Sequence, residues 1–409
     1  MTKVINDKKS VGELLTRGVE KVYPNFSELE KRLLSGDRLR LYCGFDPSAP
    51  ALHIGNAIAL NKLGQFQALG HEVIFLIGDF TGMIGDPTDK KAARRQMTRV
   101  EVLANAKDYQ TQAAAYLKFD GANPAKVLYN SAWNDKLTYK ELIELASNFT
   151  VQQMITRDMF QERLKEEKPI YLHEFFYPLT QGYDSVVMDV DLEIGGNDQL
   201  FNMLCGRDLL KALKNKEKYV LTLRLLADEG GKKMGKSEGN VVWLNAKPND
   251  MYGQVMSWPD GVICRAFESC TNVPMPEITK MTKQLQADKI NPRDLKMKLA
   301  YEITRLNAGE EAALAAQTNF IKTIQKKELP EEMATWQADR KEYNILDLLV
   351  ETDLASSKSE ARRLVEQGAI KIKSDDGLIV VEDVSDIVKI DRDIIITRGK
   401  FHFIKVLKK

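Results

Sequence analysis

The chain has 409 residues, of which 44% are hydrophobic and 29% charged, and its formal net charge is +1. This length exceeds one ordinary hydrophobic core and predicts two or three domains, while the composition is typical of a soluble globular protein. Because the net charge is close to zero, bulk charge gives no evidence of a nucleic-acid partner, and any basic surface must be local.

The sequence contains four cysteines, Cys43, Cys205, Cys264 and Cys270. Their scattered positions, without Cys-x-x-Cys spacing, favour free and mostly buried thiols in a reducing compartment and do not indicate a zinc site. The N-terminal residues have neither the apolar stretch of a signal peptide nor the Arg- and Ser-rich composition of a transit peptide. No apolar run approaches the roughly 20 residues that span a bilayer, so we expect a cytoplasmic protein with no membrane partner.

The first clear elements form a strand–helix–strand unit. Residues 38–45 alternate between apolar and other side chains, as in a β-strand. After a Pro-containing loop, a helical stretch runs from His53 to Gly70, a residue suited to a helix C-cap. Residues 73–77 are a continuous apolar run of the kind found in buried parallel strands. This order predicts a right-handed βαβ unit.

The alternation of strands and helices continues to about residue 245. Capping-box spacings open two further helices, at Thr98 and at Thr138. Further strands are predicted at residues 127–129, 190–194 and 219–223, with a helix at 198–213. The pattern predicts an α/β fold with a doubly wound, Rossmann-like parallel sheet. Ligands of such sheets bind beyond the C-terminal strand ends, where residues 44–46 and 78–82 fall.

The rest of the chain is first helical and then mixed. Residues 249–325 have a helical pattern, and the segment that follows is polar and contains proline. Two short amphipathic helices come next, at 345–354 and 359–367, with strands at 369–372, 378–381, 394–397 and 401–406. We therefore expect a catalytic domain (1–245), an α-helical domain (246–328), a linker (329–343) and a small α+β module (344–409).

Two short segments point to phosphate chemistry. His53-Ile-Gly-Asn56 lies at a predicted helix start, and helix N-termini attract phosphate. Lys233-Met-Gly-Lys236-Ser237 places two ammonium groups on a Gly-containing loop that can close over a polyphosphate. A lone histidine is usually an ordinary buried or surface residue, and loop lysines are usually solvated. Together, the two segments favour a nucleotide site. Ser48 can equally have a local turn role, and a local helix-start role is favoured for Asn56.

A third set of polar residues has helical spacing. Tyr177, Gln181 and Asp184 lie at i, i+4 and i+7, which places them along one helix face. Apolar residues on either side favour a pocket over a solvent-exposed face.

Three turns offer less specific candidates. Asp86 lies in a Gly-Asp-Pro turn, residues 195–199 form a strand-to-helix turn, and Asn130 follows a predicted strand. Each can be a local turn former or can direct a side chain into the cleft.

The motifs resemble those of the bacterial tyrosyl-tRNA synthetases, which are class I aminoacyl-tRNA synthetases. Six segments occur in the order seen in that family, at residues 42–47, 53–56, 85–87, 177–184, 195–199 and 233–237. Residues 359–368 resemble the RNA-binding module named after the fourth ribosomal small-subunit protein. Two positions depart from the family pattern, since Asn56 replaces the second histidine of the first motif and Gly235 replaces a serine of the last.

The resemblance implies that L-tyrosine reacts with ATP, bound with Mg²⁺ as substrate, to give tyrosyl-adenylate, and that the tyrosyl group is then transferred to the 3′ end of tRNA(Tyr). Tyr42 and Asp184 would bind the phenol of tyrosine. The tyrosine ammonium would be bound by Asp86, Tyr177 and Gln181. ATP or the adenylate would be bound by Gly44, Asp46, Ser48, His53, Asn56, Asp198, Gln199, Lys233 and Lys236. The residues implied in catalysis are His53, Lys233 and Lys236.

The resemblance also implies a role in binding tRNA for both C-terminal segments. The helical domain would bind the anticodon arm, and the small module would use Lys358, Arg362 and Arg363 in its local basic cluster. A homodimer is implied, as is the absence of a tightly bound cofactor or a metal site.

Two other functions remain open on sequence grounds. A tryptophanyl-tRNA synthetase shares the fold and loops, but the polar pair Tyr42 and Asp184 and the C-terminal module argue against it. A non-catalytic, synthetase-like RNA-binding protein is the second alternative, and the intact lysines and pocket carboxylates argue against that reading.

Overall fold

The computed structural model describes residues 3–88, 96–226, 241–325, 333–374, 377–399 and 402–408. The chain divides into two compact units, Met1–Leu314 and Ala315–Lys409. The predicted Lys233–Ser237 loop, with Lys233 and Lys236, lies outside the described residues.

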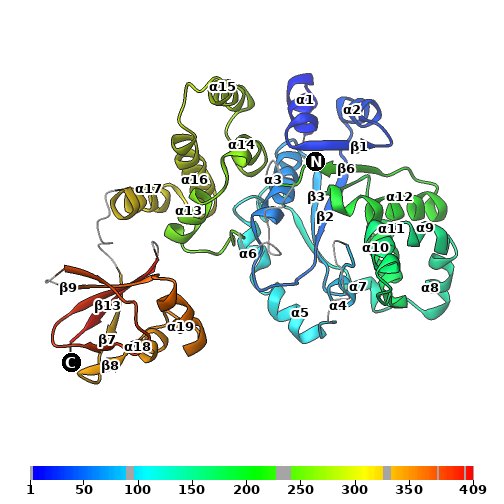
Figure 1. Cartoon of the computed structure of the whole chain (residues 1–409). Coiled ribbons are helices and arrows are strands. Elements are labelled where there is room, and N and C mark those ends of the chain that lie inside the picture. The colour runs from blue at the N-terminus through cyan, green and yellow to red at the C-terminus, as the bar shows by residue number, and fades with distance from the viewer. Residues whose placement is uncertain are drawn as a thin grey trace. The chain divides into compact units, whose positions relative to one another are not determined.

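A six-stranded sheet with the order β1-β6-β5-β2-β3-β4 forms the centre of the first unit (Figure 1). Its strands are β1 (Val19–Tyr23), β2 (Arg40–Phe45), β3 (Glu72–Ile77), β4 (Lys126–Tyr129), β5 (Leu192–Gly196) and β6 (Tyr219–Leu223). From β6 to β4 the neighbours are parallel, which confirms the predicted doubly wound sheet, and β1 is antiparallel to β6 at the edge. The sequence pattern does not predict β1, because most of its side chains are partly or fully exposed.

The helix α1 (Lys8–Thr16) precedes the first strand of this sheet, and the other helices connect its strands. These are α2 (Phe26–Leu34), α3 (Ile54–Ala68), α4 (Thr81–Ile84), α5 (Arg99–Ala106), α6 (Tyr109–Ala113), α7 (Ser131–Asn134), α8 (Tyr139–Ala146), α9 (Val151–Ile155), α10 (Asp158–Lys165), η1 (Leu172–Phe175), α11 (Phe176–Met188), η2 (Asn197–Gln199) and α12 (Leu200–Lys214). The capping boxes predicted at Thr98 and Thr138 are both formed. Right-handed crossovers place α3 and α12 on opposite faces of the sheet, because the strand order reverses between β2 and β5 (Figure 1). This reversal is the position at which such sheets bind ligands.

The helical segment predicted at 249–325 is confirmed, and its first part packs against α3. Its elements are α13 (Pro248–Met256), η4 (Asp260–Val262), α14 (Ile263–Cys270), α15 (Met275–Gln286), α16 (Pro292–Ala308), α17 (Glu310–Phe320) and η5 (Ile321–Gln325). Asn61 of α3 donates to the carbonyl oxygens of Ser269 and Thr271, each at 3.3 Å. Residues up to 314 thus belong to the same compact unit as the sheet, and the division at residue 245 remains a prediction. No helix in the described ranges is long and apolar enough to cross a bilayer.

The second unit, Ala315–Lys409, contains the strands and helices of a small α+β module, and the predicted start of that module at residue 344 stays a prediction. A five-stranded sheet with the order β10-β9-β12-β13-β7 and a two-stranded sheet of β11 and β8 accompany two helices. The elements are β7 (Ala334–Gln337), β8 (Glu342–Asn344), α18 (Ile345–Glu351), α19 (Lys358–Glu366), β9 (Ile370–Ser374), β10 (Gly377–Val380), β11 (Ile387–Lys389), β12 (Ile394–Arg398) and β13 (His402–Leu407).

The predicted linker at 329–343 is wrong from residue 334 onward. The strand β7 pairs in parallel with β13, and β8 pairs with β11. Tyr343 is 2% exposed within the core of the unit, and Trp336 packs against the same core. The sequence looks like a linker because the other side chains of β7 are exposed, as expected of a short edge strand.

All four cysteines are free, and Cys43, Cys205 and Cys270 are buried while Cys264 is half-buried. The prediction of free, mostly buried thiols is therefore confirmed.

Candidate functional site

Polar side chains meet at the C-terminal edge of the parallel sheet. The strands β2 and β3 run in register from Arg40 opposite Glu72 to Phe45 opposite Ile77, so Asp46 and Gly78 follow at the same level. Thr81 Oγ1 donates to Asp46 Oδ1 at 2.6 Å, and Asn130 Nδ2, after β4, donates to Thr81 Oγ1 at 3.0 Å. A chain of hydrogen bonds therefore links the ends of three neighbouring strands.

Asp46 is fixed from two sides at this edge. Its Oδ2 accepts a 2.8 Å hydrogen bond from the Tyr177 hydroxyl. Burial and the nearby Asp46 charge hold the pKa of Tyr177 well above its usual range, so this phenol stays a donor. A Cβ atom at Gly78 would lie 2.0 Å from Asp46 Oδ1 and 2.4 Å from Thr81 Oγ1. Only glycine fits beside this pair.

The helix α11 carries Tyr177, Gln181 and Asp184, which confirms their predicted helical placement. Tyr177 is 6% and Asp184 2% exposed, and Gln181 is half-buried. This face of α11 is therefore not a solvent-exposed face, and the pocket at this face stays a prediction.

Asp184 is a buried carboxylate surrounded by neutral N–H donors. Its Oδ1 accepts from Trp133 Nε1 at 2.8 Å and from Asn134 Nδ2 at 3.2 Å, and its Oδ2 accepts from Asn130 Nδ2 at 3.2 Å. Burial raises the pKa of Asp184 to about 8, although the three donors act in the opposite direction. Sequence reasoning missed Trp133 and Asn134; their only signal was their position on α7, directly after β4.

The Tyr42 side chain is fully buried, and its hydroxyl bonds to Ser185 Oγ at 2.8 Å. The resemblance pairs Tyr42 with Asp184. Burial is the main cause that holds the pKa of Tyr42 well above its usual range, and the charge of Asp184 adds to this shift. Trp133 packs against the cluster that contains Tyr42 and donates to Asp184. Trp133 thus links Tyr42 and Asp184, and Ser185 is the hydrogen-bond partner of Tyr42.

Asp86 and Gln199 are brought together across the site. Gln199 Nε2 donates to Asp86 Oδ2 at 2.7 Å, while Asp86 Oδ1 accepts from the backbone N–H and the hydroxyl of Thr88. Arg157 Nη2 donates to Thr88 Oγ1 at 2.7 Å. Asp86 is therefore both a turn former and a cross-link to the turn after β5, so its two sequence readings are compatible.

His53 is the N-cap of α3 and forms a reciprocal capping box with Asn56. The Asn56 backbone N–H donates to His53 Nδ1 at 3.3 Å, and Asn56 Oδ1 accepts from the His53 backbone N–H at 3.0 Å. A Cβ atom at Gly55 would lie 2.9 Å from the His53 ring, so glycine lets the ring fold over the first turn. Asn56 thus has the local helix-start role that the sequence left open.

The chain that follows the undescribed Lys233–Ser237 segment passes beside His53. Ile54 N donates to Val242 O and Leu244 N donates to Leu52 O, each at 2.9 Å. The rings of His53 and Trp243 lie 6.1 Å apart.

The remaining predicted nucleotide residues lie on the loops that follow β2 and β5. Gly44 is exposed at the end of β2, and Ser48 is exposed on the loop that follows. A Cβ atom at Gly196 would lie 2.3 Å from Asp198 Oδ1, so the Asp198 carboxylate folds back over the end of β5. The predicted tRNA-binding residues belong to the other unit, where Lys358, Arg362 and Arg363 are exposed on α19.

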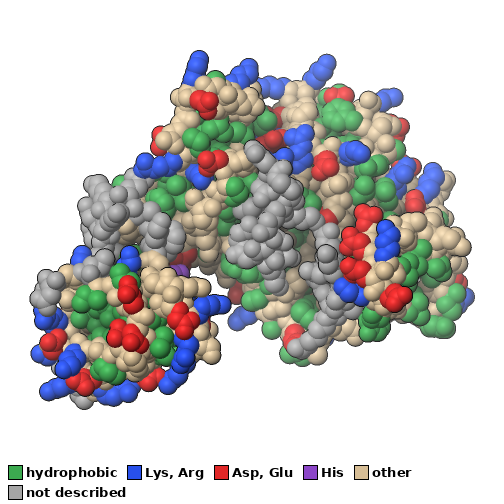
Figure 2. Space-filling view, viewed as in Figure 1, with side chains coloured by type: hydrophobic (Ala, Val, Ile, Leu, Met, Phe, Trp, Pro, Cys, Tyr) green, Lys and Arg blue, Asp and Glu red, His purple; other side chains and the backbone are tan. Residues whose placement is uncertain are grey.

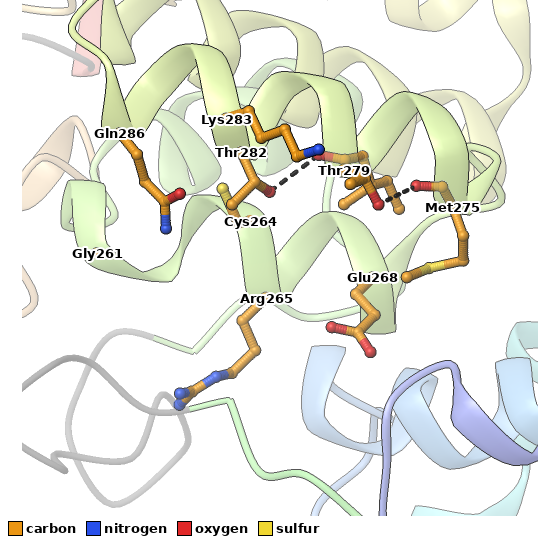
Figure 3. A pocket seen from close by; sticks show the side chains of 10 residues that line it. Gly261, Cys264, Arg265, Glu268, Met275, Thr279, Thr282, Lys283 and Gln286 are labelled. Atoms are coloured by element: carbon orange, nitrogen blue, oxygen red, sulfur yellow. Dashed lines mark hydrogen bonds between the residues drawn. The ribbon is translucent and has the colours of Figure 1, made fainter.

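A separate open pocket of about 460 Å³ lies along α14 and α15 (Figure 3). None of the predicted site residues lines it. The hydroxyls of Thr279 and Thr282 donate to carbonyl oxygens of their own helix, at 2.9 Å each. These two hydroxyls are therefore occupied within α15.

The capping box makes a testable prediction for stability. Asn56→Ala removes the acceptor for the His53 N–H and should lower the free energy of unfolding by about 0.5–1 kcal/mol. Asn56→Asp keeps that acceptor near a positive helix end and should retain wild-type stability. Urea unfolding of the two variants checks this, and an Asn56→Ala protein as stable as the wild type would contradict the capping role.

Comparison with known proteins extends over almost the whole chain. The model of class I tRNA synthetases (W and Y) matches residues 34–325, and the model of the tyrosine–tRNA ligase SYY-like C-terminal domain matches residues 325–406. The tyrosine–tRNA ligase of Thermotoga maritima is 44% identical over 380 residues, which is 93% of each chain. That of Carboxydothermus hydrogenoformans is 40% identical and covers 98% of this chain and 99% of its own.

A solved structure has the same fold. The C-terminally truncated mitochondrial tyrosyl-tRNA synthetase of Coccidioides posadasii aligns with a TM-score of 0.62 and 26% identity, over 76% of this chain and 92% of that one. The family models and the two relatives together cover most of the chain. The chain therefore belongs to the class I tRNA synthetases of the tryptophan and tyrosine family.

Proposed function

We propose that this protein activates L-tyrosine with ATP and transfers the tyrosyl group to the 3′ end of tRNA(Tyr). The observation that carries the proposal is α11, which presents Tyr177, Gln181 and Asp184 from one helix to the strand ends. Full-length relatives named tyrosine–tRNA ligase support it. A cytoplasmic location and the absence of a tightly bound cofactor stay predictions.

The phenol of tyrosine is matched by a buried acceptor and a buried hydroxyl. Asp184 receives three N–H donors, while a carboxylate has about four acceptor sites. It therefore retains the capacity to accept a phenol O–H. Tyr42, with its hydroxyl, is linked to Asp184 through Trp133. Phenylalanine would bring no hydroxyl to these groups, and a hydrogen bond missing at a buried polar group costs about 1–3 kcal/mol.

The tyrosine ammonium is matched by three acceptors. The Tyr177 oxygen can accept because its proton goes to Asp46, and Asp86 supplies negative charge. Gln181 Nε2 donates to Glu193, which leaves its carbonyl oxygen to accept. An ammonium group has only donors, so the three groups suit it.

Adenylate formation needs positioning rather than a protein nucleophile. A carboxylate oxygen of tyrosine attacks the α-phosphorus of ATP, and the bond to the pyrophosphate leaving group breaks. Asp46, Ser48, Asp198 and Gln199 would surround the nucleotide beside the open backbone of Gly44. His53 and the N-terminus of α3 would face phosphate. The side-chain oxygen of Asn56 already accepts a hydrogen bond in the capping box, so Asn56 would contact phosphate through its side-chain N–H groups. Lys233 and Lys236 would stabilise the charge on the pyrophosphate.

Amino-acid-dependent exchange between pyrophosphate and ATP tests the function. Tyrosine should support exchange, and its kcat/KM should exceed those of phenylalanine and tryptophan by at least about a hundredfold, because both buried polar groups discriminate. Exchange with tryptophan alone would identify a tryptophanyl-tRNA synthetase. A protein that forms no adenylate with any amino acid would support the RNA-binding alternative.

A homodimer is the second part of the proposal. Large apolar side chains are exposed on neighbouring elements from α8 to η1, namely Tyr139, Ile143, Val151, Leu164, Tyr171 and Leu172. Figure 2 shows hydrophobic side chains on the surface formed by α8 and α9. Exposed apolar surface of this kind is typical of protein interfaces, and a two-fold dimer would cover it with its own copy.

Light scattering should therefore give twice the 46.3 kDa mass of one chain. Val151→Glu places a charge in this surface and should shift the protein towards the monomer. Ile379→Glu, at an exposed apolar residue of the second unit, is the matched control and should leave the dimer intact. A monomeric wild-type protein would refute the dimer.

The third part of the proposal concerns tRNA binding by α19. Arg362 and Arg363 are exposed on this helix, whereas Lys358 forms an ion pair with Asp347. Figure 2 shows Lys and Arg side chains across the surface of this unit. Arginines suit phosphate through paired N–H donors, so Arg362 and Arg363 are the stronger candidates.

Arg362→Ala/Arg363→Ala should raise the KM for tRNA and leave tyrosine-dependent exchange unchanged. If each arginine contacts one phosphate, the slope of log KM against log salt should fall by roughly 1.4–1.8. Lys389→Ala, at a residue of the same unit that is 73% exposed, is the control and should change neither quantity. An unchanged salt slope would remove both arginines from the tRNA interface.

A further inference from the structure

A fully buried ion pair lies behind the proposed tyrosine site. Glu193 of β5 and Lys218, which precedes β6, form the pair, and their side chains are 2% and 0% exposed. A buried ion pair rarely adds more stability than apolar residues of similar volume, because both charges lose their hydration. The reason for this ion pair is therefore sought in the residues that it contacts rather than in stability.

The pair contacts one proposed tyrosine-binding residue, Gln181, directly and a second, Tyr42, through Ser185. Glu193 Oε1 accepts from Gln181 Nε2 at 3.0 Å, and its Oε2 accepts from Lys218 and, at 3.4 Å, from Ser185 Oγ. Lys218 Nζ also donates to Ser185 Oγ at 2.9 Å, and Ser185 bonds to the Tyr42 hydroxyl.

Gly206 of α12 makes room for this network. A Cβ atom there would lie 2.6 Å from Lys218 Nζ and 2.8 Å from Ser185 Oγ. The ammonium is thus confined in one position by the backbone of α12.

The polarity of the network is fixed by chemistry. A charged carboxylate only accepts hydrogen bonds and an ammonium only donates them, whereas a glutamine amide has one face of each kind. Glu193 therefore holds the NH₂ face of Gln181, and the carbonyl face is turned away from the pair. Lys218 balances the buried charge of Glu193. Because its ammonium group only donates hydrogen bonds, the atom of residue 193 next to it must be an acceptor.

We propose that Glu193 and Lys218 are positioning residues that hold the Gln181 amide with its oxygen towards the substrate ammonium. The proposal rests on the proposed tyrosine-activating function. It assigns to the pair the preference of the site for a free amino group, although neither residue touches the substrate.

Glu193→Gln is the central test. Lys218 would hold the oxygen of the new amide, whose NH₂ would face Gln181 and turn that amide over, so that a donor meets the ammonium. The KM for tyrosine and the Ki of tyramine should rise roughly tenfold to a hundredfold. The KM for ATP and the Ki of 3-(4-hydroxyphenyl)propionate, which has the phenol but no amino group, should stay within about twofold.

Two double variants separate positioning from folding. In Glu193→Gln/Lys218→Met the amide at 193 can turn its oxygen to Gln181, and binding of tyramine should recover to within about threefold of the wild type. In Glu193→Leu/Lys218→Met no acceptor remains, and tyramine binding should weaken while propionate binding does not. Both lack buried charge, so this comparison holds even where Glu193→Gln alone does not fold.

Equal weakening of tyramine and propionate in these variants would show a merely structural pair and overturn the proposal. Unchanged tyramine binding in Glu193→Gln and in Glu193→Leu/Lys218→Met would also overturn it. Wild-type exchange with tyrosine distinguishes the two levels of inference. If the wild-type protein shows this exchange, either contradicting result refutes only the positioning role. If the wild-type protein shows no exchange, the proposed function is refuted as well.

Discussion

The site depends on parallel strands that end level at one edge and on the hydrogen bonds that join those ends. Asp46, Thr81 and Asn130 follow three neighbouring strands and form a continuous chain that reaches Asp184 on α11. Each group has a hydrogen-bond partner, and Thr81, Asn130 and Asp184 are also buried. None of them can therefore move without leaving another unsatisfied. The geometry of these polar groups is therefore set by the fold.

Glycines let this edge close tightly. Gly78 admits the Asp46 carboxylate, Gly55 admits the His53 ring, and Gly206 admits the Lys218 ammonium. In each case a Cβ atom would fall within 3 Å of the polar group. The missing side chain of each glycine thus leaves space for a neighbouring polar side chain. A substitution to alanine would fill that space without altering the charge.

Local patterns predicted the parts of the molecule that local forces determine. The spacing of Tyr177, Gln181 and Asp184 predicted one helix face, and the apolar run of β3 predicted a buried strand. Trp133, Asn134, Glu193 and Lys218 were missed, because their roles arise only when α7, β5 and β6 come together beside α11. Edge strands such as β7 escaped prediction because most of their side chains are exposed. Asn56 carried a motif signal that the structure explains by helix capping.

Glu193 and Asp184 are two buried carboxylates near the site, and their hydrogen-bond partners differ in charge. Glu193 is balanced by an ammonium, so the pair is close to neutral and acts through geometry rather than through a field. Asp184 receives only neutral N–H donors, which stabilise a charge without cancelling it. Burial nevertheless raises its pKa to about 8. A further donor, such as a phenol, would favour the charged form of Asp184. In the proposed site, the phenol of tyrosine would supply this donor to Asp184, and phenylalanine would not.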